Sequence, residues 1–163
     1  MNKTVVVVED DLEIADILQK YLLAAELEVK HFADGAGVVE WVKQYQPAVM
    51  LLDIDLPTKQ GTDVCREVRQ FSQLPIIMTT AKVEEVDRLI GLEIGADDYV
   101  CKPYSVKELV ARVKVQLRRL NQQAQHNAML QVDPDAFRVG YQGQSVELTA
   151  IEFKLFYLLY SHP

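Results

Sequence analysis

Residues that can do chemistry stand at the ends of four apolar or β-branched runs of this sequence. Carboxylic acids follow two of the runs, a hydroxyl closes another and an ammonium group follows the last; these residues are Glu9, Asp10, Asp53, Asp55, Thr80 and Lys102. Carboxylate oxygens are the ligands that Mg²⁺ and Mn²⁺ prefer. A metal beside a lysine can balance the charge that develops during phosphoryl transfer. The pattern therefore indicates phosphoryl chemistry with Mg²⁺, or with Mn²⁺ as an alternative metal.

Strand-like and helix-like segments alternate through residues 1–120. The strand-like runs cover residues 4–8, 29–32, 49–52, 76–80 and 99–101. Stretches with apolar residues at helical spacing follow them, over residues 12–25, 38–45, 64–71, 83–94 and 106–117. This alternation predicts an α/β fold, a doubly wound parallel sheet with helices on both faces. Ligands bind beyond the carboxyl ends of such strands, so the chemically capable residues should converge there.

Each of these residues also has a purely structural explanation. Asp10 or Asp11 can cap the helix that begins beside it, and an isolated acid in a loop is usually solvated. Asp53 is the hardest to explain in this way, because it closes an apolar run where an unpaired carboxylate is costly. Thr80 alone is typical of a strand, and Tyr99 alone is typical of the edge of a core. Their expected convergence is what favours a common site.

The combined pattern resembles the receiver domain of two-component response regulators. It covers residues 3 to about 120, and the residues that carry it after the acidic pair are Asp53, Pro57, Gly61, Thr80-Ala81 and Lys102-Pro103. Residues 91–99 are most similar to the OmpR/PhoB subfamily, and residues 65–69 and 101–104 to its BaeR-type members. The resemblance implies a flavodoxin-like (βα)5 fold.

The resemblance implies a phosphoacceptor protein rather than an enzyme with external substrates. Asp53 would accept a phosphoryl group from the phosphohistidine of a sensor histidine kinase. The protein would catalyse only its own phosphorylation and dephosphorylation. Glu9 and Asp10 would form the acidic pair that holds Mg²⁺, together with Asp53 and the backbone carbonyl of Asp55. Lys102 would pair with the phosphoryl group, and the peptide bond that follows it would be cis.

The resemblance also implies a switch and a homodimer. Thr80 would supply the hydroxyl that moves to the phosphoryl group, and Tyr99 would turn inward into the vacated space. A mixed-sign surface on the fourth helix, fifth strand and fifth helix would then pair across a two-fold axis. Its expected residues are Arg88, Glu93, Asp97, Asp98, Glu108, Arg112 and Arg119. The alternative is a solvated face of mixed charge.

Asp55 departs from the resemblance, because related sequences usually carry an apolar residue at that position. A carboxylate there can add metal affinity, orient a water that hydrolyses the phosphoryl group, or point to solvent. Our hypothesis is that Asp55 shortens the phosphorylated lifetime. The spacing of Asp53 and Asp55 also matches the acid pair of haloacid-dehalogenase-type phosphohydrolases, which is one rival function. A stand-alone receiver that only docks partners is another.

The sequence after residue 120 follows a different pattern. Residues 121–128 are polar, lack an apolar stripe and predict a linker. Short strands are predicted at residues 129–132, 137–141 and 145–148. Thr149 and Glu152 form a capping box, which predicts that a helix begins there.

The resemblance makes residues 129–163 the N-terminal part of a truncated winged-helix DNA-binding domain, preceded by the receiver domain at residues 1–120. Winged helices read DNA with a helix in the major groove and with basic contacts to phosphates. Arg138 and Lys154 are the only basic residues after residue 120. We therefore expect a complete version to bind promoter DNA, but not this chain.

Composition sets outer bounds on the class of protein. The 163 residues include 17 basic and 24 acidic side chains, and the net charge of −7 argues against a surface built mainly for nucleic acid. No apolar run approaches the roughly 20 residues that span a membrane, and the start does not read as a signal peptide. Cys65 and Cys101 form neither a disulfide framework nor a metal motif. We expect a cytoplasmic protein with reduced thiols.

Overall fold

The computed structural model describes residues 3–81, 94–141 and 144–161, with only the backbone for residues 123–129. The chain separates into two compact units, Met1–Leu117 and Arg118–Pro163. Most of the helix predicted at residues 83–94, including Arg88 and Glu93, lies outside the described residues.

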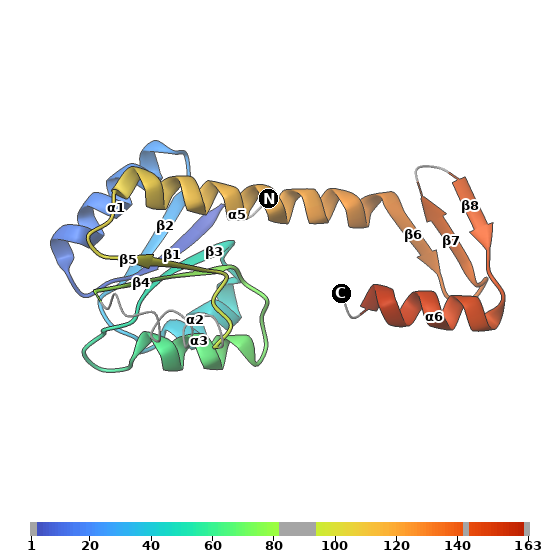
Figure 1. Ribbon diagram of the computed structural model, residues 1–163, viewed down its shortest axis with the longest axis horizontal. Helices are drawn as coiled ribbons and strands as arrows, with labels where there is room; N and C mark the ends of the chain where they lie inside the picture. Colours follow the sequence, from blue (N-terminus) through green and yellow to red (C-terminus); the bar gives the residue numbers. More distant parts are fainter. Residues whose placement is uncertain (1–2, 82–93, 142–143, 162–163) are drawn as a thin grey trace. The chain divides into compact units, whose positions relative to one another are not determined.

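Five strands form the parallel sheet that the alternating pattern predicts (Figure 1). In the order of the sheet, β2-β1-β3-β4-β5, the strands are Glu28–Phe32, Thr4–Val8, Val49–Asp53, Ile76–Thr80 and Asp98–Cys101. This order is that of flavodoxin-like folds, whose ligand site lies where the strand order reverses, between β1 and β3. The central strands β3 and β4 are buried along their whole length, because helices cover both faces of a parallel sheet. The predicted fold class is confirmed.

Alternate residues of each strand enter two separate cores. On β1, Val6 and Val8 pack in one core with side chains of α2 and α3. Val5 and Val7 pack in the other core with side chains of α1 and α5. These helices are α1 (Leu12–Ala24), α2 (Val38–Tyr45), α3 (Gly61–Arg69) and α5 (Val106–Met129), and Figure 1 shows the two pairs on opposite sides of the sheet.

The helix α5 is longer than the sequence pattern predicts. Its apolar stripe ends near Leu117, and we expected residues 121–128 to form a separate linker, but the helix continues to Met129. The polar stretch holds no proline or glycine, and its glutamines and alanines are good helix formers. Adding a residue to an existing helix costs far less than starting a new one, so the helix extends without an apolar face.

The second unit contains a three-stranded antiparallel sheet and one helix, as the sequence predicts. Its elements are β6 (Leu130–Asp133), β7 (Arg138–Tyr141), β8 (Gln144–Glu147) and α6 (Ala150–Ser161). The predicted capping box is present, since the Thr149 N–H donates to Glu152 Oε2 at 2.8 Å and the Glu152 N–H donates to Thr149 Oγ1 at 3.4 Å.

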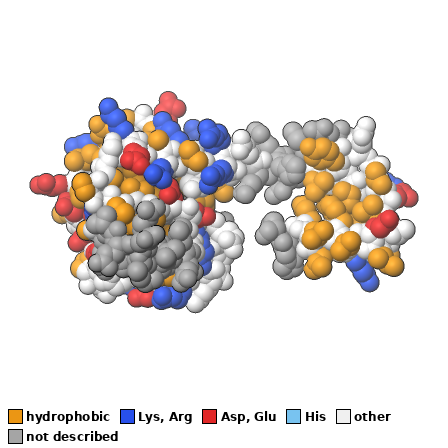
Figure 2. All heavy atoms as spheres, viewed as in Figure 1, with side chains coloured by type: hydrophobic (Ala, Val, Ile, Leu, Met, Phe, Trp, Pro, Cys, Tyr) orange, Lys and Arg blue, Asp and Glu red, His pale blue; other side chains and the backbone are white. Residues whose placement is uncertain are grey.

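The core of the second unit is small. The buried ring of Phe153 on α6 meets the ring of Phe137 edge-on, at 5.5 Å between centroids. Much of α6 remains exposed, and its exposed apolar side chains include Ile151, Leu155, Leu158 and Leu159. Figure 2 shows hydrophobic side chains gathered over this unit. Among the described residues, no helix combines the length and the apolar character that crossing a membrane requires.

Candidate functional site

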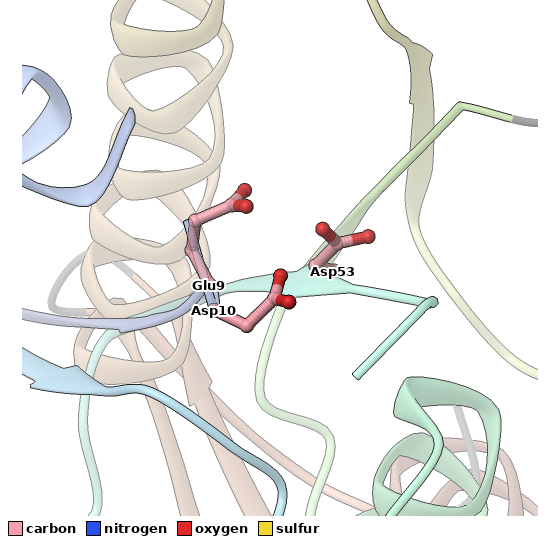
Figure 3. A group of neighbouring side chains, drawn as sticks. All are labelled: Glu9, Asp10 and Asp53. Carbon is pink, nitrogen blue, oxygen red and sulfur yellow. The ribbon is translucent and has the colours of Figure 1, made fainter. Parts of the chain in front are cut away.

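Three acidic side chains meet where β1 and β3 end (Figure 3). Asp53 is the last residue of β3, and Glu9 and Asp10 directly follow β1. These strands are adjacent and parallel, with Val8 opposite Leu52, so their carboxyl ends lie at the same edge of the sheet. One carboxylate oxygen of each acid lies within 4.8 Å of those of the other two. The sheet register thus joins acids that are distant in sequence.

The neighbouring acid Asp11 has a different task, because it caps α1. Its Oδ1 accepts hydrogen bonds from the backbone N–H groups of Glu13 and Ile14, at 2.9 and 3.1 Å. A cap of this kind stabilises a helix by about 1 kcal/mol. Since Asp11 satisfies the first turn, the capping explanation does not apply to Asp10, whose exposed side chain belongs to the acidic cluster.

Lys102, directly after β5, brings one positive charge to two buried carboxylates. Its Nζ lies 2.6 Å from Asp53 Oδ2 and 2.9 Å from Glu9 Oε1. The exposed fractions of the two acids are only 3% and 1%, so these are interactions with little competing water. Burial alone would lower the pKa of Lys102, but its hydrogen bonds to Asp53 and Glu9 outweigh burial and raise that pKa. The peptide bond between Lys102 and Pro103 is cis.

One ammonium group does not neutralise the cluster. Burial, reinforced by the charge of Asp53, raises the pKa of Glu9 to about 7, although Lys102 opposes this shift. Glu9 and Asp53 therefore share Lys102 and still repel each other. The cluster is ready to gain a further positive charge.

The composition of the cluster fits a hard divalent cation. Glu9, Asp10 and Asp53 offer only oxygen donors, which suit Mg²⁺ or Mn²⁺. Asp10 is exposed while the other two are buried, so the cluster opens to water on one side. Mg²⁺ keeps several waters in most protein sites, and an open cluster allows this.

Asp55 contacts both the acidic cluster and the end of β4. Its backbone N–H donates to Asp53 Oδ1 at 3.2 Å, which helps to hold that carboxylate in place. Its Oδ2 lies 3.5 Å from the hydroxyl of Thr80, a long hydrogen bond in which the hydroxyl donates. Thr80 is fully buried, and its carbonyl accepts from the Lys102 N–H at 2.6 Å. The side chain of Asp55 is exposed, so it faces water as well as the Thr80 hydroxyl.

Gly61 approaches Asp53 more closely than any other residue type could. A Cβ at this position would lie 2.0 Å from the backbone oxygen of Asp53 and 2.9 Å from Cα of Ile54. The Gly61 N–H also donates to the carbonyl of Ile54 at 2.9 Å. Gly61 is part of the sequence motif, but the sequence does not show why glycine is needed there. The reason is that the start of α3 packs against the end of β3.

Tyr104 lies beside the cluster and was not singled out from the sequence. It follows Lys102 by two residues and packs against the core of α1 and α5. Burial, reinforced by the charge of Glu9, raises its pKa to about 12. The only sequence signal that could have indicated that Tyr104 lies near the site is its position two residues after Lys102.

Tyr99, the expected switch aromatic, is buried in this structure. It lies on β5 and packs in the core formed with α2 and α3, with an exposed fraction of 7%. The resemblance implies that this ring turns inward when Thr80 moves. The structure holds the ring inward while Thr80 donates to Asp55.

Three residues of the expected dimer face form one ion-pair group on β5 and α5. The guanidinium of Arg112 lies 2.7 Å from Asp98 Oδ2 and 2.7 Å from Glu108 Oε1. All three side chains are partly exposed, and Arg119 further along α5 is exposed as well. These ion pairs form within one chain, so each of the three charges already has a partner of opposite sign before any dimer forms.

Asp97, which we also expected on the dimer face, has an exposed side chain that pairs with Arg69 of α3. Asp97 Oδ2 accepts from Arg69 Nη2 at 2.7 Å and from the Ile76 N–H at 2.8 Å. The Arg69 guanidinium also donates to the carbonyls of Gly95 and Leu74, at 2.7 and 2.6 Å. Asp97 thus joins the segment before β5 to the end of α3.

Comparison with known proteins identifies the family. Residues 5–114 match the model of the response regulator receiver domain. The chain belongs to the response regulators. The matched receiver region runs from β1 into α5 and contains every described residue of the acidic site, from Glu9 to Lys102.

Individual relatives support the same assignment. The transcriptional regulatory protein BaeR of Escherichia coli is 44% identical over 98% of this chain and 68% of its own length. The BeF3-activated N-terminal receiver domain of Klebsiella pneumoniae RstA is 34% identical, with a TM-score of 0.67 over 71% of this chain and 98% of that one. A response regulator from Chloroflexus aurantiacus is 35% identical, with a TM-score of 0.67 over 72% and 99%. The receiver fold therefore covers the first unit, and the likeness to BaeR extends through the second.

Proposed function

We propose that this response regulator accepts a phosphoryl group on Asp53 from the phosphohistidine of a sensor histidine kinase. The observation that carries the proposal is the placement of a buried Asp53 carboxylate between Lys102 and the carboxylates of Glu9 and Asp10. The family assignment supports phosphorelay signalling. It also favours a phosphoacceptor that catalyses only its own phosphorylation and dephosphorylation over a haloacid-dehalogenase-type hydrolase.

The chemistry at Asp53 is a displacement at phosphorus. A carboxylate oxygen of Asp53 forms a bond to phosphorus while the bond from phosphorus to the histidine nitrogen breaks, and the imidazole leaves with the electron pair. Lys102, already 2.6 Å from Asp53 Oδ2, balances negative charge on the reacting oxygens. Mg²⁺ bound by Glu9, Asp10, Asp53 and the Asp55 carbonyl would supply further positive charge there.

Phosphorylation would then act on the switch residues. A phosphoryl group adds about −1.5 to −2 charge and strong acceptor oxygens. Thr80 closes the neighbouring strand β4, and its hydroxyl would donate to one of these oxygens. Tyr99 would remain inward when Thr80 moves, which would favour one arrangement of the face around β5 and α5.

We assign the face around β5 and α5 to homodimer formation. Asp98, Glu108 and Arg112 stay as candidates because they form one partly exposed ion-pair group. Arg119 is exposed and stays as a candidate on the resemblance alone. A mixed-sign patch can be self-complementary, as a two-fold interface requires. Asp97 also stays as a candidate, since its side chain is 41% exposed although it pairs with Arg69. Control of transcription would follow from this dimer through DNA binding.

A phosphorylation assay tests the proposal. The chain is incubated with acetyl phosphate and Mg²⁺, and intact mass reports the gain of one phosphoryl group. We expect the gain to be lost with Asp53→Ala and with EDTA. The matched control is Asp16→Ala, which removes an exposed acid of α1 that pairs with Lys20 away from the cluster. Phosphoryl gain that survives Asp53→Ala would overturn the assignment.

A further inference from the structure

Asp55 contacts the phosphoacceptor through its backbone and the switch hydroxyl through its side chain. Its backbone N–H donates to Asp53 Oδ1 at 3.2 Å, and its own Oδ2 accepts from Thr80 Oγ1 at 3.5 Å. A threonine hydroxyl carries a single proton and can donate it to one strong acceptor at a time. The carboxylate of Asp55 therefore occupies the donor that a phosphoryl group on Asp53 would need.

We infer that the Asp55 carboxylate is a positioning residue that competes with the phosphoryl group for the Thr80 hydroxyl. The inference deepens the proposed function and rests on it. With Asp53 unphosphorylated, the hydroxyl points to Asp55; on phosphorylation, it must leave one anionic acceptor for another. Both partners are anionic oxygens, and the long contact to Asp55 is the weaker of the two. It still lowers the net gain from bonding the phosphoryl group, so the switch resets more easily than one with an apolar residue at position 55.

Burial gives this competition its effect. Thr80 is fully buried at the end of β4, so water does not readily replace either acceptor. Asp55 itself is exposed, so its carboxylate can return to water once the hydroxyl leaves. The cost of the exchange therefore falls on the Thr80 hydrogen bond and not on the desolvation of Asp55.

Position 55 also acts through charge alone, and the two effects must be separated. A carboxylate near the phosphoryl oxygens repels them whatever Thr80 does. The charge effect is independent of the Thr80 hydroxyl, whereas competition for the hydroxyl disappears when that hydroxyl is absent. A double-mutant cycle between the two positions distinguishes them.

The experiment measures the affinity of the chain for beryllofluoride with Mg²⁺, by ¹⁹F NMR, in four proteins: wild type, Asp55→Ala, Thr80→Val and the double variant. We expect Asp55→Ala to tighten binding about threefold to tenfold when Thr80 is present and to have a much smaller effect in the Thr80→Val background. An equal effect in both backgrounds would overturn the competition and leave charge as the only role of Asp55.

A second measurement needs neither metal nor phosphoryl mimic. Three-bond couplings to the Thr80 methyl group report its χ1 rotamer in the unphosphorylated chain. We expect one dominant rotamer in the wild type and a redistribution in Asp55→Ala, with Asp55→Asn between them because its amide oxygen still accepts. An unchanged rotamer in Asp55→Ala contradicts the inference. Beryllofluoride binding that persists in Asp53→Ala would instead contradict the proposed function, so the two failures are distinct.

Discussion

At the scale of single residues, the site is governed by a shortage of positive charge. Glu9 and Asp53 are buried beside each other, and both interact with the same ammonium group of Lys102. Removing one member of such a buried group leaves an uncompensated charge, which is far more costly than losing an exposed ion pair. A divalent cation would compensate the excess negative charge. In the absence of a cation, this excess charge should make the stability of the fold depend on pH.

Metal-free protein should lose stability as the pH rises from about 4.5 to about 7. The pKa of Glu9 rises from 4.5 to about 7 on folding, so the native state binds more protons than the unfolded state in this window. The contribution is fully present below pH 4.5 and falls by on the order of 3 kcal/mol by the top of the window. Urea denaturation in EDTA, followed by the fluorescence of Trp41, measures it.

The matched variant for this pH dependence is Glu9→Gln, which should flatten the curve over the same window because it has no proton to lose. Added Mg²⁺ should raise stability more at pH 8 than at pH 5, because binding to the native state adds to its stability and the carboxylate is then ionised. A wild-type curve that stays flat between pH 4.5 and 7 would contradict the role of Glu9.

Gly61→Ala should destabilise the chain by about 3 kcal/mol and strongly reduce phosphorylation of Asp53. The added Cβ would lie 2.0 Å from the backbone oxygen of Asp53, and backbone cannot move aside as a flexible side chain can. The control is Gly37→Ala, where nothing lies within 4 Å and only the φ of +72° is strained. That variant should lose about 1 kcal/mol and keep normal phosphorylation. Equal phosphorylation by both variants contradicts the argument.

At the scale of elements, the sheet is held to its helices by packing and by the partly buried side chain of Arg69. Arg69, at the end of α3, has a side chain that is 15% exposed and donates to the carbonyls of Gly95 and Leu74 and to Asp97. These contacts fix the segment before β5, and β5 in turn delivers Lys102 to the site. The acidic site thus depends on an arginine at the opposite end of the strands.

Arg69→Ala should therefore destabilise the chain by about 1–3 kcal/mol, because it leaves several partly buried acceptors without their donor. Arg66→Ala is the control on the same helix, since Arg66 forms one ion pair with Asp63 in which both side chains are well exposed. It should cost about 0.5 kcal/mol or less. Chemical denaturation of the two variants compares them directly, and similar midpoints would refute the role given to Arg69.

At the scale of the whole molecule, the two units have unequal cores. The first buries two sets of side chains on opposite faces of its sheet. Among the side chains that the structure describes, the second buries little more than Phe153 and exposes much of α6. The chain spans about two thirds of the length of BaeR, with 68% of that protein matched.

This chain should not bind DNA specifically. After residue 120 it carries Arg138 and Lys154 as its only basic side chains, and Arg138 is paired with Glu147. Binding to phosphates depends on several such charges. A gel shift at low salt with acetyl phosphate present should show no sequence preference. A shifted band that resists an excess of unrelated DNA contradicts the expectation.

The sequence by itself determined the sheet, because most of its strands are short apolar or β-branched runs with turn or helix residues on either side. The alternation of Val5 to Val8 between two cores follows from the period of a strand, and the place of Asp53 follows from its position at the end of such a run. Local patterns of this kind require no knowledge of which strands are neighbours. The extension of α5 was missed because helix propagation needs no apolar stripe.

The tertiary structure alone decided how side chains from different strands pair. It assigned capping to Asp11 and left Asp10 in the cluster, it turned Asp97 toward Arg69, and it set Asp55 against Thr80. Such pairs depend on strand register and on distances of a few ångströms between residues that are far apart in sequence. Hydrophobic periodicity fixes which residues enter the core, but the partners of polar groups at the strand ends are fixed only when the sheet has assembled.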